Sequence, residues 1–398
     1  MVTAVSLLAV DTAACDPYTA APAPTNRLGV RTRGISMLNR DTLMQALCAV
    51  QEPDLQRDIV SAQLLHSLHI DGETVTMTLV PTTPASPHIA GMVAQMQAIA
   101  TAQGATAVQV RVERPVLIDA AGKPKIACMI GVGAGKGGVG KSTVASNLAV
   151  ALAKAGARVG LLDADIYGPS VPILMGLRGA KPAVNAARQI VPAVAHGVKT
   201  TSIGFMVQED MAVAWRGPMI GKAVTQLLQD VEWGELDYLI VDLPPGTGDV
   251  VLSLCQAAAL DGAIVVSTPQ DVAFADVLRA VRMFSMLKVE VVGLVENMSH
   301  FLCPDNGKTY EIFGPSNSPR HCAAHDLQFL ASLPIELQVS PSADAGLPIV
   351  VADPKSDLSQ RYRALASDLA SRMVQSQTAA KRQAEVGKGF FTVHEHTP

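Results

Sequence analysis

The chain has 398 residues, of which 49% are hydrophobic and 17% charged, so it is long enough for two domains and too apolar for general disorder. Its net charge of −4 comes from scattered acidic and basic residues, which argues against a nucleic-acid partner. Its apolar runs are too short to cross a bilayer, so we expect no membrane partner.

The first part of the chain predicts a loose extension followed by a small α+β domain. Residues 1–36 are rich in Pro, Ala and Thr without periodicity, so we expect them to be disordered, and Met37 is a candidate for the natural start. Residues 37–113 then read as a helix, two strands joined by a turn at Asp71 and Gly72, a second helix and a last strand. The Pro- and Gly-containing stretch 114–125 predicts a linker.

From residue 126 to residue 372, strand-like runs alternate with helical ones. Several of these strands are apolar throughout, as expected when helices cover both faces of a parallel sheet. We therefore expect a doubly wound, mostly parallel α/β domain. The last segment, residues 373–398, is polar and has no continuous apolar face, which predicts a frayed end.

A phosphate-binding loop stands at the start of this second domain. The segment GKGGVGKS matches G-x-x-x-x-G-K-[ST] between an apolar strand and a helical pattern, which is the context of a P-loop NTPase. Its backbone N–H groups would hold ATP phosphates, Lys141 would neutralise the outer ones, and Ser142 would bind Mg²⁺. The predicted ATP-binding residues of this loop are Gly135, Lys136, Gly137, Gly138, Val139, Gly140, Lys141, Ser142 and Thr143. An ATP site, together with six cysteines whose spacing fits no disulfide framework, predicts a cytoplasmic protein.

Lys136 is a lysine that an ordinary phosphate loop does not need. It either lies in solvent or reaches a phosphate that Lys141 does not cover. With this lysine, GKGGVGKS resembles the MinD-like family of deviant Walker A ATPases. The resemblance implies a homodimer in which Lys136 reaches the partner's nucleotide and stabilises charge in the transition state, as arginine fingers do.

Three carboxylates follow predicted strands, at the edge where open α/β sheets bind ligands. Asp163 and Asp165 end the run LLDAD, and Asp242 ends DYLIVD at the Walker B position, where it would accept from a magnesium-bound water. The MinD-like resemblance makes Asp165 the residue that orients the attacking water and Asp163 a support for Mg²⁺ or for the loop. Capping of a turn is the alternative for both. Residues 244–248 predict a second switch loop, with a rigid strand exit as the alternative.

Longer phrases narrow the family, namely DADIYGPSVPILMG, WRGPMIGKA, DLPPGTGD, and ENMSHFLCP followed by IFG. Over roughly residues 126–369 they resemble the Mrp/ApbC family of iron–sulfur cluster carrier ATPases, and the front domain is similar to the small domain of many such carriers. The resemblance implies ATP hydrolysis coupled to a bridging iron–sulfur cluster, delivery to apo iron–sulfur proteins, and contact with cluster-assembly proteins. The family resemblance also makes Asn297 the adenine reader, because an amide both donates and accepts; a turn residue is the alternative.

Two positions depart from the carrier pattern. The C-x-x-C motif that supplies two thiolates per subunit reads Cys303-Pro304-Asp305-Asn306 here, so a dimer would offer two thiolates to a cluster that takes four. Cys303 is therefore either a cluster ligand or an inert loop thiol, and Cys322 is a weaker candidate ligand. In the front domain Ser86 replaces the usual cysteine, and serine binds iron poorly.

Two other functions compete with the carrier. A MinD-like regulatory or positioning switch without a cluster would need a C-terminal amphipathic membrane helix, whereas residues 379–398 lack a broad apolar stripe. An ATPase like nitrogenase iron protein would need a cysteine soon after GDVV, where Leu252 stands, and Cys255 is predicted to lie in a helix core. The sequence therefore favours the carrier.

Overall fold

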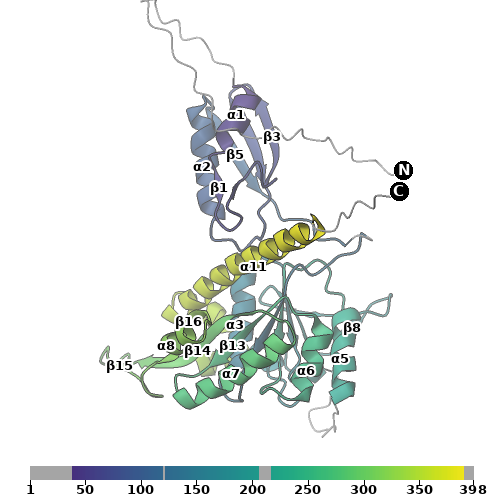
Figure 1. Ribbon diagram of the computed structural model, residues 1–398, viewed down its shortest axis with the longest axis vertical. Helices are drawn as coiled ribbons and strands as arrows, with labels where there is room; N and C mark the ends of the chain where they lie inside the picture. Colours follow the sequence, from purple (N-terminus) through teal and green to yellow (C-terminus); the bar gives the residue numbers. More distant parts are fainter. Residues whose placement is uncertain (1–37, 120–121, 206–216, 390–398) are drawn as a thin grey trace, which may run out of the picture. The chain divides into compact units, whose positions relative to one another are not determined.

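The computed structural model describes residues 38–119, 122–205 and 217–389 (Figure 1). The predicted extension 1–36, the candidate start at Met37 and the last residues, 390–398, lie outside the described residues. Within the described ranges, no helix combines the length and the apolar character needed to cross a membrane.

The front module, residues 38–112, is built on a three-stranded sheet in the order β3-β4-β5. Its helices and strands are α1 (Arg40–Leu47), β1 (Gln51–Glu52), β2 (Arg57–Asp58), β3 (Leu65–Asp71), β4 (Thr74–Leu79), α2 (Ile89–Ala102) and β5 (Ala107–Val112). The predicted turn joins β3 to β4, where Gly72 has φ +58°, a left-handed conformation that favours glycine. Met92 and Met96, one helical turn apart on α2, pack with Val75 and Met77, which point to one face of β4. The predicted order of elements is therefore confirmed, with a short β1–β2 hairpin added.

The main module holds a nine-stranded sheet within the described residues, in the order β10-β11-β7-β12-β6-β13-β14, with β15 and β16 both paired to β14. Its strands are β6 (Met129–Gly133), β7 (Val159–Asp163), β10 (Ala193–Ala195), β11 (Val198–Ser202), β12 (Tyr238–Asp242), β13 (Gly262–Ser267), β14 (Val291–Leu302), β15 (Thr309–Tyr310) and β16 (Phe329–Ile335). All pairs are parallel except β10 with β11 and β14 with β15. The small hairpin of β8 (Ala183–Val184) and β9 (Ile190–Val191) stands apart from it.

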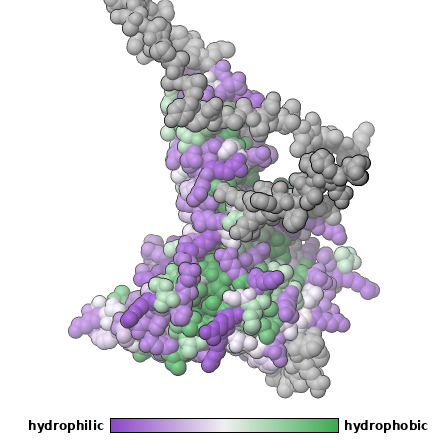
Figure 2. All heavy atoms as spheres, in the orientation of Figure 1, coloured by the Kyte–Doolittle hydropathy of each residue, from purple (hydrophilic) through white to green (hydrophobic). Residues whose placement is uncertain are grey.

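Helices cover both faces of this sheet, because alternate strand residues point to opposite sides. Ile240 of β12 packs with Leu148 and Leu365 in one core, whereas its neighbour Val241 packs with Leu254 and Val277 in the other. The first core takes residues from α3 (Lys141–Lys154), α10 (Ile349–Ala352) and α11 (Asp357–Gly389); the second from α5 (Gly217–Gln229), α6 (Asp249–Ala258) and α7 (Asp271–Met286). The short helices are α4 (Val171–Leu174), η1 (Ile203–Phe205), α8 (Ser318–Ala324) and α9 (Val339–Asp344). The predicted doubly wound α/β fold is confirmed, and Figure 2 shows apolar residues gathered over the middle of this module.

The C-terminal helix differs from the expected frayed end. Helix α11 continues past residue 372 as far as Gly389. Its Met373 is buried in the first core, and its Gln377 Nε2 donates to the carbonyl oxygen of Ala127 at 3.2 Å. Met373 and Gln377 thus attach the part of α11 just beyond residue 372 to the main module, although its composition predicts no apolar stripe.

Candidate nucleotide site and carrier loop

The phosphate loop connects β6 to α3, and its glycines sit where other residues would not fit. Gly138 and Gly140 have φ of +79° and +80°, in the left-handed region that favours glycine. A Cβ added to Gly135 would lie 2.3 Å from the carbonyl oxygen of Asp276 on α7. The loop can therefore follow this path, with backbone N–H groups exposed for an anion, only with glycine at these positions.

Lys141 meets Asp165 and Asp242 behind the loop, at the carboxyl ends of β7 and β12, with Asp163 next to them. These strands are parallel neighbours, and their register pairs Asp242 with Asp163. Lys141 Nζ lies 2.6 Å from Oδ1 of Asp242 and 3.6 Å from Oδ2 of Asp165. All four side chains are buried. The structure thus brings Lys141, Asp165 and Asp242 together at one point.

Three buried carboxyl groups, those of Asp163, Asp165 and Asp242, and one buried lysine lie at this point. Burial, and then the charge of Asp242, raise the pKa of Asp163 to about 8. Burial likewise raises the pKa of Asp242, while Lys141 opposes that shift. Oδ2 of Asp242 and Oδ1 of Asp165 are buried without a hydrogen-bond partner in the described part of the chain. Two unsatisfied carboxylate oxygens beside Ser142 suit Mg²⁺, which prefers oxygen ligands.

Asp163 holds the loop that follows β7. Its Oδ1 accepts from the backbone N–H of Asp165 at 3.1 Å, and its Oδ2 accepts from the N–H of Val171 at 3.2 Å and from Ser202 Oγ at 3.0 Å. Both oxygens are thus engaged within the protein. Of the two roles expected for Asp163, this geometry favours loop support over magnesium ligation.

The predicted second switch loop, residues 244–248, starts directly after β12. Its Gly246 has φ +91° and donates its N–H to the carbonyl oxygen of Ala134 at 2.9 Å, at the start of the phosphate loop. The two loops are therefore in direct contact.

Asn297 lies against the phosphate loop. Its Nδ2 donates to the carbonyl oxygen of Val139 at 2.9 Å, and a Cβ added to Gly140 would lie 2.3 Å from the same nitrogen. One N–H and the Oδ1 of the amide remain for a base edge. The sequence placed Asn297 near the end of its strand, but β14 continues to Leu302.

Beyond Asn297, the extension of β14 forms a hairpin that carries Cys303. The Cys303 N–H donates to Lys308 O, and the Gly307 N–H donates to Cys303 O. Asn306, at the position of the second family cysteine, accepts from the Lys308 N–H at 2.9 Å and donates to the Tyr310 hydroxyl at 3.1 Å. Asn306 therefore shapes the turn with both ends of its amide.

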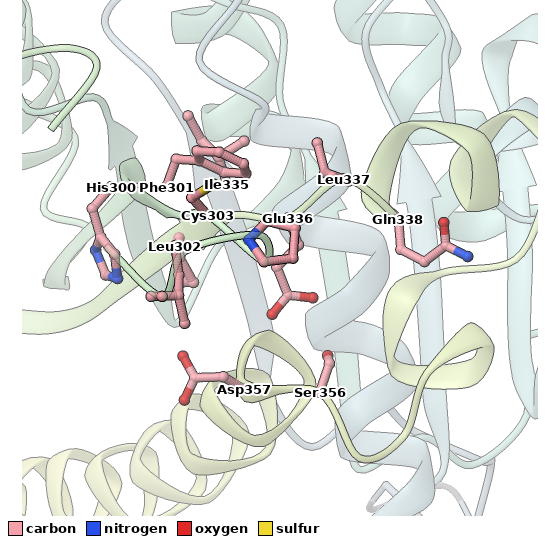
Figure 3. A pocket seen from close by; sticks show the side chains of 13 residues that line it. His300, Phe301, Leu302, Cys303, Ile335, Glu336, Leu337, Gln338, Ser356 and Asp357 are labelled. Carbon is pink, nitrogen blue, oxygen red and sulfur yellow. The ribbon is translucent and has the colours of Figure 1, made fainter. Parts of the chain in front are cut away.

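A hollow of about 570 Å³ opens beside Cys303 (Figure 3). Its walls come from the hairpin at residues 300–304 and 307, the end of β16 and the loop after it at residues 334–338, and residues 356 and 357 at the start of α11. Most of the lining is apolar, and Glu336 and Asp357 add acidic groups. The half-buried Cys303 thiol thus borders a space large enough for a small molecule.

Comparison with known proteins decides the family. The model of the NUBPL iron-transfer P-loop NTPases matches residues 125–370, and that of the iron–sulfur cluster assembly proteins matches residues 40–112. The chain belongs to the NUBPL iron-transfer P-loop NTPase family. The iron–sulfur cluster carrier protein of Deinococcus radiodurans is 44% identical over 84% of this chain and 95% of its own length. The carrier protein of Synechocystis is 41% identical over 85% of this chain and 98% of its own.

One solved structure that is similar to this NUBPL-family chain contains a nucleotide. A nucleotide-binding protein from Archaeoglobus fulgidus, in complex with ADP, has a TM-score of 0.52 and 39% sequence identity, and the match covers 59% of this chain and 91% of that one. The resemblance of this chain to iron–sulfur cluster carriers, predicted from sequence phrases, is confirmed by the family models and by the two carrier proteins.

Apart from Cys303, the cysteines of the main module are core residues in this family member. Burial raises the pKa of Cys322 to about 11 and that of Cys255 to about 12, so both stay protonated, and Cys128 is buried as well. The described residues contain no group of three or more His, Cys, Asp or Glu placed to hold a metal ion. In the front module, Ser86 Oγ accepts from the His88 N–H at 3.2 Å and shapes a turn. The structure thus places Cys322, the weaker candidate ligand, among the core residues next to α7.

Some contacts around the site carried no sequence signal. Asp271 pairs with His321 and Asn317, Glu296 accepts from Ser316, and Asp276 packs on Gly135. The residues of each pair are far apart in the chain, and the partner positions Asp271, Asp276 and Ser316 belong to none of the sequence motifs described above. They come together because α7 packs on the phosphate loop and residues 316–321 lie against α7 and β14.

Proposed function

We propose that this chain binds MgATP, hydrolyses it as a homodimer, and carries an iron–sulfur cluster that it delivers to apo iron–sulfur proteins. The observation that supports ATP handling is the buried meeting of Lys141, Asp165 and Asp242 directly behind the phosphate loop. The cargo is inferred from the carrier proteins to which the chain is similar. We place this work in the cytoplasm, in two domains, 37–113 and 126–372, joined by the linker 114–125.

Binding of ATP would use the phosphate loop and β14. The backbone of residues 135–143 would surround the phosphates at the positive end of α3, and Lys141 would turn from Asp242 towards the outer phosphates. Asn297 would contact adenine with the part of its amide that Val139 leaves free.

Mg²⁺ would be held by Ser142 and, through water, by Asp242, and when bound it would neutralise charge on the phosphate oxygens. The unsatisfied Oδ2 of Asp242 is the feature of this chain that fits the ion. Asp163, whose oxygens hold the following loop, would keep Asp165 in place instead.

Hydrolysis would depend on two charged groups. Asp165 has one buried oxygen without a partner among the described residues, and this oxygen would accept a hydrogen bond from the attacking water and orient it. The half-buried Lys136 would reach the partner's nucleotide and stabilise negative charge that develops on the transferred phosphoryl group.

The cargo would be bound through Cys303 of each subunit. Asn306 is committed to the hairpin turn, so two hairpins would supply two thiolates. A cluster normally takes four thiolates, so the protein would hold it loosely and an acceptor with four cysteines would take it. Weak binding suits a carrier, because the cargo must leave.

Anaerobic reconstitution with ferrous iron and sulfide tests this proposal. Wild type should gain bound iron and visible absorption, Cys303→Ser should lose both and keep its ATPase activity, and Cys48→Ser, outside the hairpin, should match wild type. The carrier proposal is wrong if wild type binds no iron, or if Cys303→Ser binds as much as wild type.

A further inference from the structure

Helix α7 touches the phosphate loop without any intervening space. The carbonyl oxygen of Asp276, in the second turn of α7, lies only 2.3 Å from the position that a Cβ on Gly135 would take. Because this contact joins backbone to backbone, no side-chain rotation can absorb a displacement of the loop. A movement of Gly135 towards α7 must therefore be resisted by this helix or passed on to it.

The first turn of α7 is fastened to α8. Oδ1 of Asp271 accepts from Asn317 Nδ2 at 3.1 Å and from His321 Nε2 at 2.9 Å. One turn later, the ring of Phe274 stacks on that of His321, with centroids 4.6 Å apart and an interplanar angle of 22°. Asp271 is 66% exposed, so its bonds join the two helices without being part of a core.

A second connection reaches the same segment from the other end of the phosphate loop. The carbonyl oxygen of Val139 accepts a hydrogen bond from Asn297. Glu296, which precedes Asn297 in the chain, accepts a hydrogen bond from Ser316 Oγ at 2.7 Å. Glu296 is fully buried, and its other oxygen has no partner among the described residues, so this one bond is all that its side chain makes there. The two connections thus start at Gly135 and Val139 and converge on residues 316–321.

Residues 316–321 follow the hairpin that carries Cys303 in the chain, with residues 311–315 between them. Strand β15 ends at Tyr310, and α8 begins at Ser318. We propose that Asp271 is a positioning residue, and that its bonds to Asn317 and His321 couple the state of the phosphate loop to the Cys303 hairpin. This inference rests on the proposed function for its biological meaning, because Cys303 is the cargo ligand there. In that setting, nucleotide binding would change the exposure of the thiol that holds the cluster.

The test measures the thiol itself, without iron. Alkylation of Cys303 in the full chain is followed by peptide mass spectrometry, with and without saturating MgATP. In wild type the two rates should differ by about fivefold or more, the lower range for coupling between sites. In Asp271→Ala they should agree within about twofold, with ATP affinity unchanged. The buried Cys255 and Cys322 should react slowly throughout.

Two control variants separate the loss of the Asp271 hydrogen bonds from the general effect of replacing a helical aspartate. Asp271→Asn keeps an acceptor oxygen for Asn317 and His321, so it should retain the wild-type ratio. Asp368→Ala removes another partly exposed helical aspartate with an arginine partner, Arg372, and should also behave like wild type. The inference is overturned by a wild-type ratio of one, by equal ratios in wild type and Asp271→Ala, by loss of coupling in Asp271→Asn, or by lost ATP binding in Asp271→Ala. None of these outcomes involves iron, so the carrier proposal would stand or fall by reconstitution alone.

Discussion

The buried ion pair of Lys141 with Asp242 allows a quantitative prediction. Lys141→Met removes the one cation seen to contact this group of carboxylates in the described structure, leaving Asp165 and Asp242 buried near each other without it. Breaking a buried pair in this way costs about 3–5 kcal/mol of folding stability. Asp242→Asn should cost less, roughly 1–3 kcal/mol, because Lys141 keeps Asp165 at 3.6 Å.

The double variant tests whether the two side chains depend on each other. Lys141→Met with Asp242→Asn removes both charges, so it should be more stable than the sum of the single changes predicts, with a coupling of about 2 kcal/mol. Urea unfolding in nucleotide-free buffer measures the stability of all four proteins, by far-UV circular dichroism and by tryptophan fluorescence, to which Trp233, buried in the second core, contributes. Both signals should shift together if the main module unfolds as a unit.

The result that would refute this reasoning is additivity. If the double variant is destabilised by the sum of the two single effects, Lys141 and Asp242 do not form the pair in solution. A Lys141→Met protein as stable as wild type would likewise show that Lys141 and Asp242 do not form the pair in solution.

Three further changes address the chemistry. Lys136→Ala should bind ATP like wild type but hydrolyse it more slowly and dimerise less with ATP, because Lys141 remains on the same loop; hydrolysis at the wild-type rate would contradict the trans role. Asp165→Asn should bind ATP and turn it over slowly, because an amide is a poorer acceptor for the attacking water than a carboxylate; loss of ATP binding, measured by equilibrium dialysis, would point to a structural role. Asn306→Cys should make a reconstituted cluster resist chelators for longer, since a dimer would then supply four thiolates; unchanged chelation kinetics would exclude this hairpin as the cluster site.

The sequence predicted those parts of the site whose functional residues lie close together in one segment of the chain or at the ends of neighbouring strands. The phosphate loop has its glycines, lysine and serine within one segment, and its place between a strand and a helix follows from the flanking pattern. The approach of Asp163 to Asp242 was also predictable, because carboxyl ends of parallel strands meet at one sheet edge.

Other features depend on packing between distant segments. Residues 373–398 have no continuous apolar face, which predicts a frayed end, whereas the burial of Met373 and the bond from Gln377 show that α11 still packs on the main module beyond residue 372. Asn306 could be recognised as a missing thiolate, but its two bonds within the hairpin could not. The bonds of Asp271 to α8 were equally hidden, since neither periodicity nor a motif joins residues that far apart.

The most direct test of the whole account is cluster transfer. Reconstituted wild-type protein is mixed anaerobically with an apo iron–sulfur acceptor, and the acceptor's visible spectrum is followed with and without MgATP. The account predicts transfer whose rate changes with MgATP in wild type and does not respond to it in Lys136→Ala. Transfer at one rate in all four reactions would contradict it, because ATP would then have no part in the release of the cargo.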